Sequence, residues 1–338
     1  MDRTVKAGKL SPQKLKGLVF DRLHQRRLDI LLRPGLGEDS AVIDFGDEVC
    51  VISTDPITGA TRRLGWLAVH VSCNDIAANG AEPVGIQVAL LLPEGTTDEF
   101  ISELMADMDA ACAELGIEIL GGHTEITSQA RGPLVITTAV GRAPRDRYVT
   151  SHGAQPGDII YVTKGVGFEG TGILASDHRH RLEGLVDQKI LKAASRFLDQ
   201  ISVVPEALAA ASAGATAMHD ITEGGFYGAL WEVLSASQRG CQINLADVPV
   251  LPETKAICDA LELDPFGLIS SGSLLIAAPP HASVVERVAG VGITAHSVGK
   301  VTGSTGGILE LILANGQRQV LTEPNEDELW RFLRQGPG

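Results

Sequence analysis

The sequence lacks the features that mark several common classes of protein. Lys and Arg number 28 against 42 Asp and Glu, which gives a formal net charge of −14 and a pI near 5.1. No basic cluster suited to a phosphate backbone is present, so we expect no nucleic-acid partner. The longest apolar run, residues 84–92, is too short to span a bilayer, and residues 1–10 contain no apolar leader. These absences predict a cytoplasmic protein with no membrane partner.

Cysteine is also scarce, and its spacing excludes two kinds of site. The five cysteines are odd in number and contain no CxxC pair. This pattern excludes a zinc ribbon and argues against a disulfide framework, as expected in a reducing compartment. A GxxxxGK[ST] segment is absent as well, so a P-loop cannot hold a nucleotide phosphate here.

What the chain does contain is enough apolar sequence for two folded units. Its 338 residues are 44% apolar, which favours two domains of about 150 residues each. We predict a mixed α/β (α+β) fold with domains at 1–145 and 158–338, joined by a polar linker at 146–157. In the first half we expect strands at 41–43, 49–53, 85–92, 118–120 and 134–140, and helices at 66–78 and from a Thr96–Glu99 capping box to Gly116. In the second half we expect strands at 159–163, 273–278 and 295–301, and helices at 187–201, 205–213, 225–237 and 326–334.

Carboxylates stand at the ends of several predicted elements. Asp39 lies in GEDSAV, Asp55 in STDP, Asp75 in NDIAANGAEP, and Glu125 in GGHTEI after a predicted strand. Asp75 belongs to an otherwise apolar helix, where an unpaired acid would cost several kcal/mol, so we expect a cation or several hydrogen bonds beside it. Acids from separate elements suit a Mg²⁺-nucleotide site. Each acid taken alone is equally typical of a turn or a helix cap.

Glycine-rich segments offer three further candidates. Gly165, Gly167 and Gly170 form a GxGxxG, but the charged segment after them lacks the strand and acid of a dinucleotide fold, so we expect a flexible or anion-facing loop, or a tight turn. HDITEGG opens a helix whose N–H groups could take a phosphate, or which is simply capped. His123, beside Thr124 and Glu125, either faces an active cleft or is structural.

Several of these motifs together resemble a known superfamily. Asp75, four residues and then GAEP match the D-x4-G-A-x-P signature of the PurM (AIR synthase) superfamily, which includes selenophosphate synthase, thiamine-monophosphate kinase and HypE. GEDSAV, STDP, GGHTEI and DITEGG resemble its other motifs, in family order over residues 35–310. The segment GTTDEF, the helix after it and DPFGLISSGSLLIA are most similar to its AIR synthase-related, HypE-like members.

The resemblance implies a fold, two cofactors and a set of site residues. It implies two PurM-like domains, with N-terminal domains that close a β-barrel across a homodimer, ATP in the cleft there, and a C-terminal α/β sandwich. Asp39, Asp55, Asp75 and Asp220 would hold Mg²⁺. The phosphate site would include Asn74, Gly121, Gly122, Thr124, Gly224 and Gly225. Our own candidates for catalytic residues are Asp75, His123 and Glu125, with His123 chosen for its place beside Thr124 and Glu125.

The chain departs from HypE at three positions, which leaves its reaction open. No cysteine follows Cys258, Glu125 stands where HypE has a lysine, and Ser271 stands where HypE has a glutamate. Our first hypothesis is an ATP- and Mg²⁺-dependent enzyme that activates an amide or carboxylate oxygen of a small substrate by phosphoryl transfer. The alternatives are an ATP-binding maturation partner that docks another protein, and a small-molecule kinase similar to thiamine-monophosphate kinase.

Overall fold

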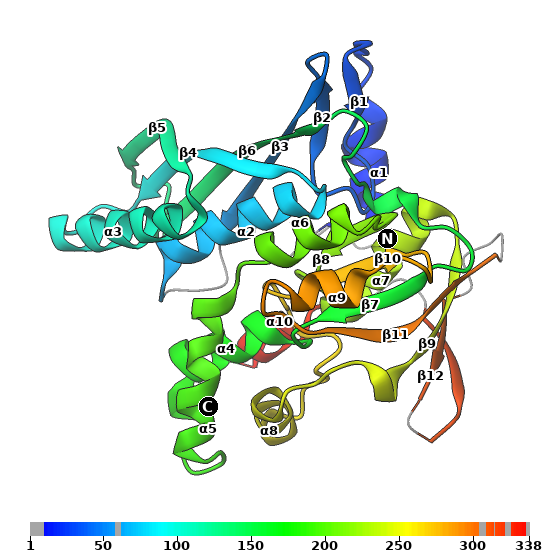
Figure 1. Cartoon of the computed structure of the whole chain (residues 1–338). Coiled ribbons are helices and arrows are strands. Elements are labelled where there is room, and N and C mark those ends of the chain that lie inside the picture. Colours follow the sequence, from blue (N-terminus) through cyan, green and yellow to red (C-terminus); the bar gives the residue numbers. More distant parts are fainter. Residues whose placement is uncertain (1–9, 58–61, 304–308, 314, 322–325, 336–338) are drawn as a thin grey trace.

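Two β-sheets, each covered by helices, make up the chain (Figure 1). The computed structural model describes residues 10–57, 62–303, 309–313, 315–321 and 326–335. The predicted α/β class is confirmed, with a first sheet that ends at Pro144 and a second that begins at Ile159. The domain boundaries themselves stay a prediction. Among the described residues, no helix combines the length and the apolar character needed to cross a bilayer.

The first sheet has six strands in the order β1-β2-β3-β6-β4-β5. Neighbouring strands are antiparallel except β4 and β5, which are parallel. The strands are β1 (Ile30–Leu32), β2 (Ala41–Asp44), β3 (Glu48–Ile57), β4 (Glu82–Leu92), β5 (Glu118–Ile126) and β6 (Leu134–Pro144). A short helix α1 (Pro12–Leu18) and a 3₁₀ turn (Phe20–Arg22) precede them. β5 is therefore an edge strand, which pairs with a single neighbour.

Helices α2 (Leu64–Ala78) and α3 (Asp98–Leu115) cover one face of this sheet (Figure 1). All 15 residues of α2 are buried, because it also packs on the second half of the chain through α6 (Val204–Ser212). α3 is amphipathic and ends at Gly116, in the left-handed conformation, as predicted. Its cap was predicted one residue early: Thr97 accepts the hydrogen bond from Phe100 N, whereas Thr96 bonds the carbonyl of Pro93.

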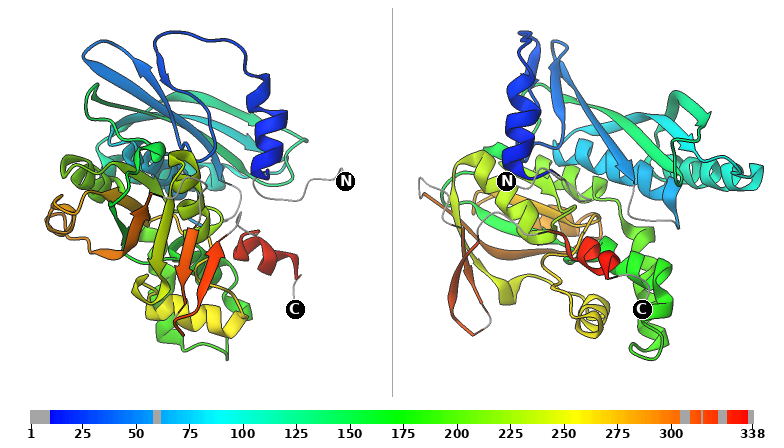
Figure 2. Two further views of the ribbon diagram at one scale, coloured as in Figure 1. Left: turned by 90° about the vertical axis from the view of Figure 1, so that its right-hand side faces the viewer. Right: turned by 180° about the vertical axis from the view of Figure 1, so that it is seen from behind.

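The second sheet has seven strands in the order β13-β12-β9-β11-β7-β10-β8. Their bounds are β7 (Ile159–Thr163), β8 (Ala217–Asp220), β9 (Gly240–Asn244), β10 (Leu274–Ala278), β11 (Ala295–Thr302), β12 (Leu309–Ile312) and β13 (Arg318–Leu321). Two layers flank the sheet: α6 and α9 (Val284–Ala289) pack on one side, and α7 (Gly225–Ser237) packs in a separate apolar cluster. The first of these layers faces α2, so that helices separate the two sheets (Figures 1 and 2).

The remaining helices gather at one end of the second sheet. They are α4 (Phe168–Asp177), α5 (Gln188–Ser195), α8 (Pro252–Leu261) and α10 (Glu328–Arg334). Short 3₁₀ turns lie at Ser151–Gly153, Arg179–Arg181, Arg196–Gln200 and Leu245–Asp247. α4 corrects the reading of GxGxxG as a loop or turn: Gly167 caps a buried helix, whose glycines pack against Leu268 and Leu198. The sequence did not predict this helix, because the charged segment that follows it is typical of a loop.

β5 is also longer than predicted. The expected strand at 118–120 extends to Ile126, so GGHTEI lies within the strand and not after it. Gly122 is explained locally: a Cβ there would stand 1.8 Å from the carbonyl oxygen of Val88 on β4. A side chain at this position would push the two strands apart.

Candidate functional site

The four acids predicted to bind Mg²⁺ converge from four separate elements. Asp39 lies before β2, Asp55 on β3, Asp75 on α2, and Asp220 at the end of β8. The negative charge of each of the other three acids raises the pKa of Asp75. Ligand atoms of Asp39 and Asp220 lie within 4.8 Å of one another. The two sheets therefore each contribute carboxylates to one cluster, hereafter the acidic cluster.

Asp75 is the most constrained of the four. Its side chain is only 7% exposed, and Ser53 Oγ lies 2.5 Å from its Oδ2. Burial, followed by the charges of Asp55 and Asp220, raises its pKa well above the usual value. The sequence led us to expect a cation or several hydrogen bonds beside this acid. The structure instead surrounds it with further acids, so a positive charge would relieve their mutual repulsion.

The donor set fits a hard divalent cation. The atoms that converge are carboxylate oxygens, which are the ligands that Mg²⁺ prefers. Asp55 Oδ2 is buried and makes no hydrogen bond within the described part of the chain. A buried carboxylate oxygen without a partner costs free energy that a bound cation would recover. The four acids therefore fit Mg²⁺.

His219 belongs to the same region, and the sequence analysis did not single it out. It lies beside Asp220 on β8, and its two ring nitrogens are each 2.7 Å from a carboxylate oxygen, Nδ1 from Asp39 and Nε2 from Glu232. Although burial opposes the charged form, these two acids raise the pKa of His219 well above its usual value. Its place next to a motif acid was the one available signal.

Asn74, predicted to contact or shape the phosphate site, is hydrogen-bonded to backbone groups of the second half of the chain. Its Nδ2 donates to the carbonyl of Ile201 at 3.0 Å, and its Oδ1 accepts from Val203 N at 2.8 Å. The amide is buried and both of its ends are used, so it joins α2 to the segment before α6. Asn74 thus shapes the site without an amide group to offer a ligand.

Gly224 and Gly225 start α7, but their N–H groups are already engaged. Gly224 N donates to Asp327 Oδ2 at 2.6 Å, and Gly225 N donates to Thr222 O at 3.0 Å. A Cβ on Gly225 would lie 2.6 Å from Phe266 O, which accounts for the glycine. Of the two readings left open for this segment, the described structure favours the capped helix. A phosphate here would have to displace Asp327.

The predicted residues of β5 lie apart from the acidic cluster within one chain. The register runs from Asp55 to Thr137, then Val88, then Gly122, three strands away. At the usual strand spacing this separation is roughly 14 Å. Gly121, Gly122, His123, Thr124 and Glu125 are all exposed. His123 Nε2 lies 3.5 Å from Glu125 Oε2, so these two face each other and not the cluster.

Ser271, where HypE has a glutamate, contacts a glutamate of this chain. The side chain and the backbone of Ser271 both hydrogen-bond the carboxylate of Glu169 on α4, and burial raises the pKa of Glu169. Glu169 was not predicted as a site residue, because it lies inside the GxGxxG segment, in which the glycines and not the acid define the motif. A carboxylate is thus present beside position 271, although it comes from another element.

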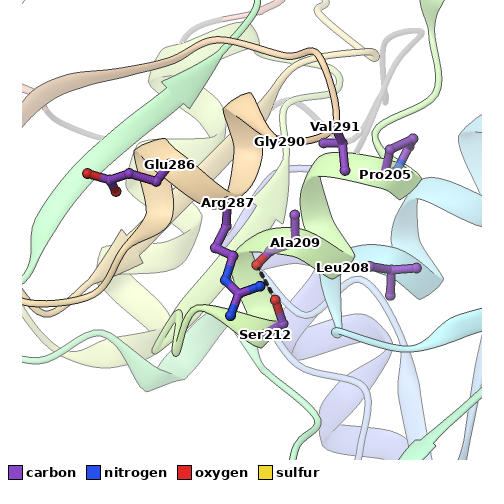
Figure 3. Close-up of a pocket in the computed structure, with 8 residues that line it drawn as sticks. All are labelled: Pro205, Leu208, Ala209, Ser212, Glu286, Arg287, Gly290 and Val291. Atoms are coloured by element: carbon purple, nitrogen blue, oxygen red, sulfur yellow. Dashed lines mark hydrogen bonds between the residues drawn. The ribbon is translucent and has the colours of Figure 1, made fainter.

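A separate hollow of about 610 Å³ lies between α6 and α9 (Figure 3). Its lining consists of Pro205, Leu208, Ala209, Ser212, Glu286, Arg287, Gly290 and Val291. Ser212 Oγ is already bonded to Ala209 O at 2.7 Å. No member of the acidic cluster contributes to this lining, so the hollow is distinct from the candidate site.

Comparison with known proteins places both halves of the chain in one family. Residues 37–143 match the N-terminal domain of AIR synthase related protein, and residues 155–312 match its C-terminal domain. Carbamoyl dehydratase HypE of Cupriavidus necator is 30% identical over 253 residues, 72% of this chain and 69% of that protein. HypE of Escherichia coli K12 is 27% identical over 317 residues, 91% and 89% of the two chains.

Solved structures show the same fold. The HypE–HypF complex matches with a TM-score of 0.75 at 20% identity, over 92% of this chain and 99% of that one. A ThiL structure complexed with AMPPCP and TMP also gives a TM-score of 0.75 at 20% identity, over 97% and 99%. With both domains and the HypE proteins in agreement, the chain belongs to the AIR synthase-related (PurM) family, on its HypE-like branch.

Proposed function

We propose that this protein is an ATP- and Mg²⁺-dependent enzyme that activates an amide or carboxylate oxygen of a small substrate by phosphoryl transfer. The observation that carries the proposal is the convergence of Asp39, Asp55, Asp75 and Asp220 from both sheets. Support comes from relatives of the same fold, since a HypE structure has been solved in complex with ATP and a ThiL structure with AMPPCP.

Each part of the site has a defined task in this proposal. The four acids hold Mg²⁺, which when bound neutralises charge on the nucleotide phosphates. Asn74 fixes α2 against the segment at 201–203 and thereby holds Asp75 in place. Catalysis then comes mainly from positioning and charge stabilisation.

A homodimer brings the remaining predicted residues to the site. His123, Thr124 and Glu125 lie on an exposed edge strand, away from the acids of their own chain. Pairing of two first sheets, as the family resemblance implies, would place β5 of one copy near the cluster of the other. His123 and Glu125 keep their proposed catalytic roles only in such an assembly. A cytoplasmic location remains part of the same prediction.

Two alternatives are favoured by specific relatives. The ThiL likeness favours a kinase, which would leave the phosphoryl group on its product. The HypE–HypF complex favours a protein partner for which this chain is the nucleotide-binding component.

The experiment combines binding with product analysis. Isothermal titration should detect Mg-ATP binding to the wild type and its loss in Asp75→Asn. A metabolite screen that follows ADP release should then find a small molecule that stimulates turnover. Free phosphate identifies the proposed reaction, and phosphate retained on the product identifies a kinase. Wild-type protein that does not bind Mg-ATP, or an Asp75→Asn variant that binds it equally well, would refute the proposal.

A further inference from the structure

We propose that His219 is a positioning residue that ties the two halves of the acidic cluster together and holds Asp39 in its metal-binding orientation. This inference rests on the proposed function, because it assigns a role within the same Mg²⁺ site. The argument comes from the contacts of the imidazole ring with groups on either side of the site.

The ring is held between carboxylates of the two halves of the chain. Nδ1 lies 2.7 Å from Asp39 Oδ2, which precedes the first sheet's strand β2, and Nε2 lies 2.7 Å from Glu232 Oε2 on α7. The His219 side chain is only 3% exposed. Each ring nitrogen is therefore already engaged by a carboxylate oxygen, one from each half of the chain. His219 is thus a buried link between the two halves of the chain.

This geometry separates His219 from the metal ligands. Its ring nitrogen lies within 4.8 Å of donor atoms of Asp39 and Asp220, which by distance alone would make a three-residue site. Each ring nitrogen already lies 2.7 Å from a carboxylate oxygen, so the carboxylates are the proposed ligands and the histidine orients them. Histidine and carboxylate partners behind metal ligands commonly act in this way.

The loop that carries Asp39 is fixed at two further points. Ser53 Oγ donates to the carbonyl of Asp39 at 2.8 Å. Gly37, at a φ of +75°, leaves room for the backbone of α7, since a Cβ there would stand 2.7 Å from Glu232 O. The glycine therefore lets the loop approach the residue that holds the other side of His219. These contacts leave Asp39 little freedom to move relative to Asp220.

A matched control lies one residue away. Glu38 is paired with His152 Nδ1 at 2.6 Å, so a second histidine ties the same loop to the second half of the chain. Neither member of this pair is a proposed metal ligand, although the charge of Asp39 acts on the neighbouring Glu38. His219→Gln and His152→Gln therefore each remove one histidine–carboxylate tie, and only the first removes the one that holds a proposed ligand.

The test measures metal binding directly, by electron paramagnetic resonance of Mn²⁺ with a non-hydrolysable ATP analogue. We expect His219→Gln to weaken Mn²⁺ binding about 10–100-fold, as for other residues that orient metal ligands. His152→Gln should change it by less than about twofold, with both variants folded by circular dichroism. Glu232→Gln, at a half-buried position, should weaken binding by a smaller factor and serves if His219→Gln does not fold.

The outcomes separate this inference from the function on which it rests. Wild-type protein that binds no Mn²⁺ with nucleotide contradicts the proposed function itself. Wild-type binding together with unchanged affinity in His219→Gln or, if that variant does not fold, in Glu232→Gln overturns only the role of His219. Equal losses in His219→Gln and His152→Gln would also overturn it, because both ties would then act through general stability.

Discussion

Asp75 illustrates a conflict between stability and function at a single side chain. It is buried among other acids, and their charges oppose its ionisation. We therefore predict that Asp75→Asn, which keeps the shape of the side chain but cannot ionise, raises the free energy of unfolding of the metal-free protein by about 1–2 kcal/mol. Urea denaturation in the presence of EDTA measures this change. A variant less stable than the wild type would mean that the carboxylate is compensated in a way that the contacts do not reveal.

With Mg-ATP present, the wild type should become more stable than Asp75→Asn. Ligand that binds only the folded state stabilises it by an amount that grows with the logarithm of the ligand concentration relative to Kd, so the wild type should gain stability and Asp75→Asn should not. The same denaturation series with Mg-ATP provides the comparison. A gain of equal size in both proteins would remove Asp75 from the site.

Side-chain chemistry explains why the sequence alone could point to Asp75 as a site residue but could not give the contacts of Asn74. An acid in an apolar helix is anomalous on its own, and its cost points to a site whatever the fold. Asn74 lies beside it in the same motif, yet its partners are Ile201 and Val203, more than a hundred residues away. Its role depends on long-range packing, which motif position does not encode. His219 escaped notice for the same reason.

Helices were predicted well where local signals were strong. The helix at 225–237 has the predicted bounds, and glycines mark its start. The strand at 159–163 also has the predicted bounds, because it is a short apolar run with clear boundaries. The missed helix α4 has glycines in its first turns, which lower helix propensity. Those glycines serve close packing against Leu268 and Leu198, so tertiary contacts override the local preference.

Asp327 connects two helices that are distant in the sequence, and this connection should respond to pH. It caps α10 through Leu329 N at 2.8 Å and receives the N–H of Gly224 at the start of α7. Burial, reinforced by the charge of Glu223, raises the pKa of Asp327 from its usual range to about 7. The folded state thus binds this proton more tightly than the unfolded state. The carboxyl's contribution to stability is greatest below about pH 4 and declines as the pH rises to about 7.

Asp327→Asn should remove this dependence. We expect the free energy of unfolding of the variant minus that of the wild type to be about 2–3 kcal/mol larger at pH 8 than at pH 5. Chemical denaturation at the two pH values measures the change. Asp187→Asn is a matched control, because Asp187 caps α5 through Lys189 N but is exposed, and its difference from the wild type should be the same at both pH values. If the free energies of unfolding of Asp327→Asn and the wild type differ by the same amount at both pH values, the raised pKa of Asp327 is contradicted.

The assembly of two chains is the remaining question, because the first sheet presents an unprotected edge. Among the described strands β5 pairs only with β4, and Leu120 and Ile126 on β5 are each 50% exposed. Unpaired edges that expose apolar side chains readily pair with another chain. The family resemblance implies that a second copy of the chain pairs with the first sheet.

We predict that the wild type is a homodimer in solution and that Ile126→Lys converts it to a monomer, because a charge at the edge opposes pairing of strands. Light scattering coupled to gel filtration measures the mass. Val320→Lys is the control, since Val320 is 56% exposed on β13, the edge strand of the second sheet, and should leave the dimer intact. If β5 completes the site across the dimer, Ile126→Lys should also lose ATP turnover while each chain still binds Mn²⁺ through its own acids. A wild-type monomer with full turnover would exclude any role for His123 and Glu125 in the reaction.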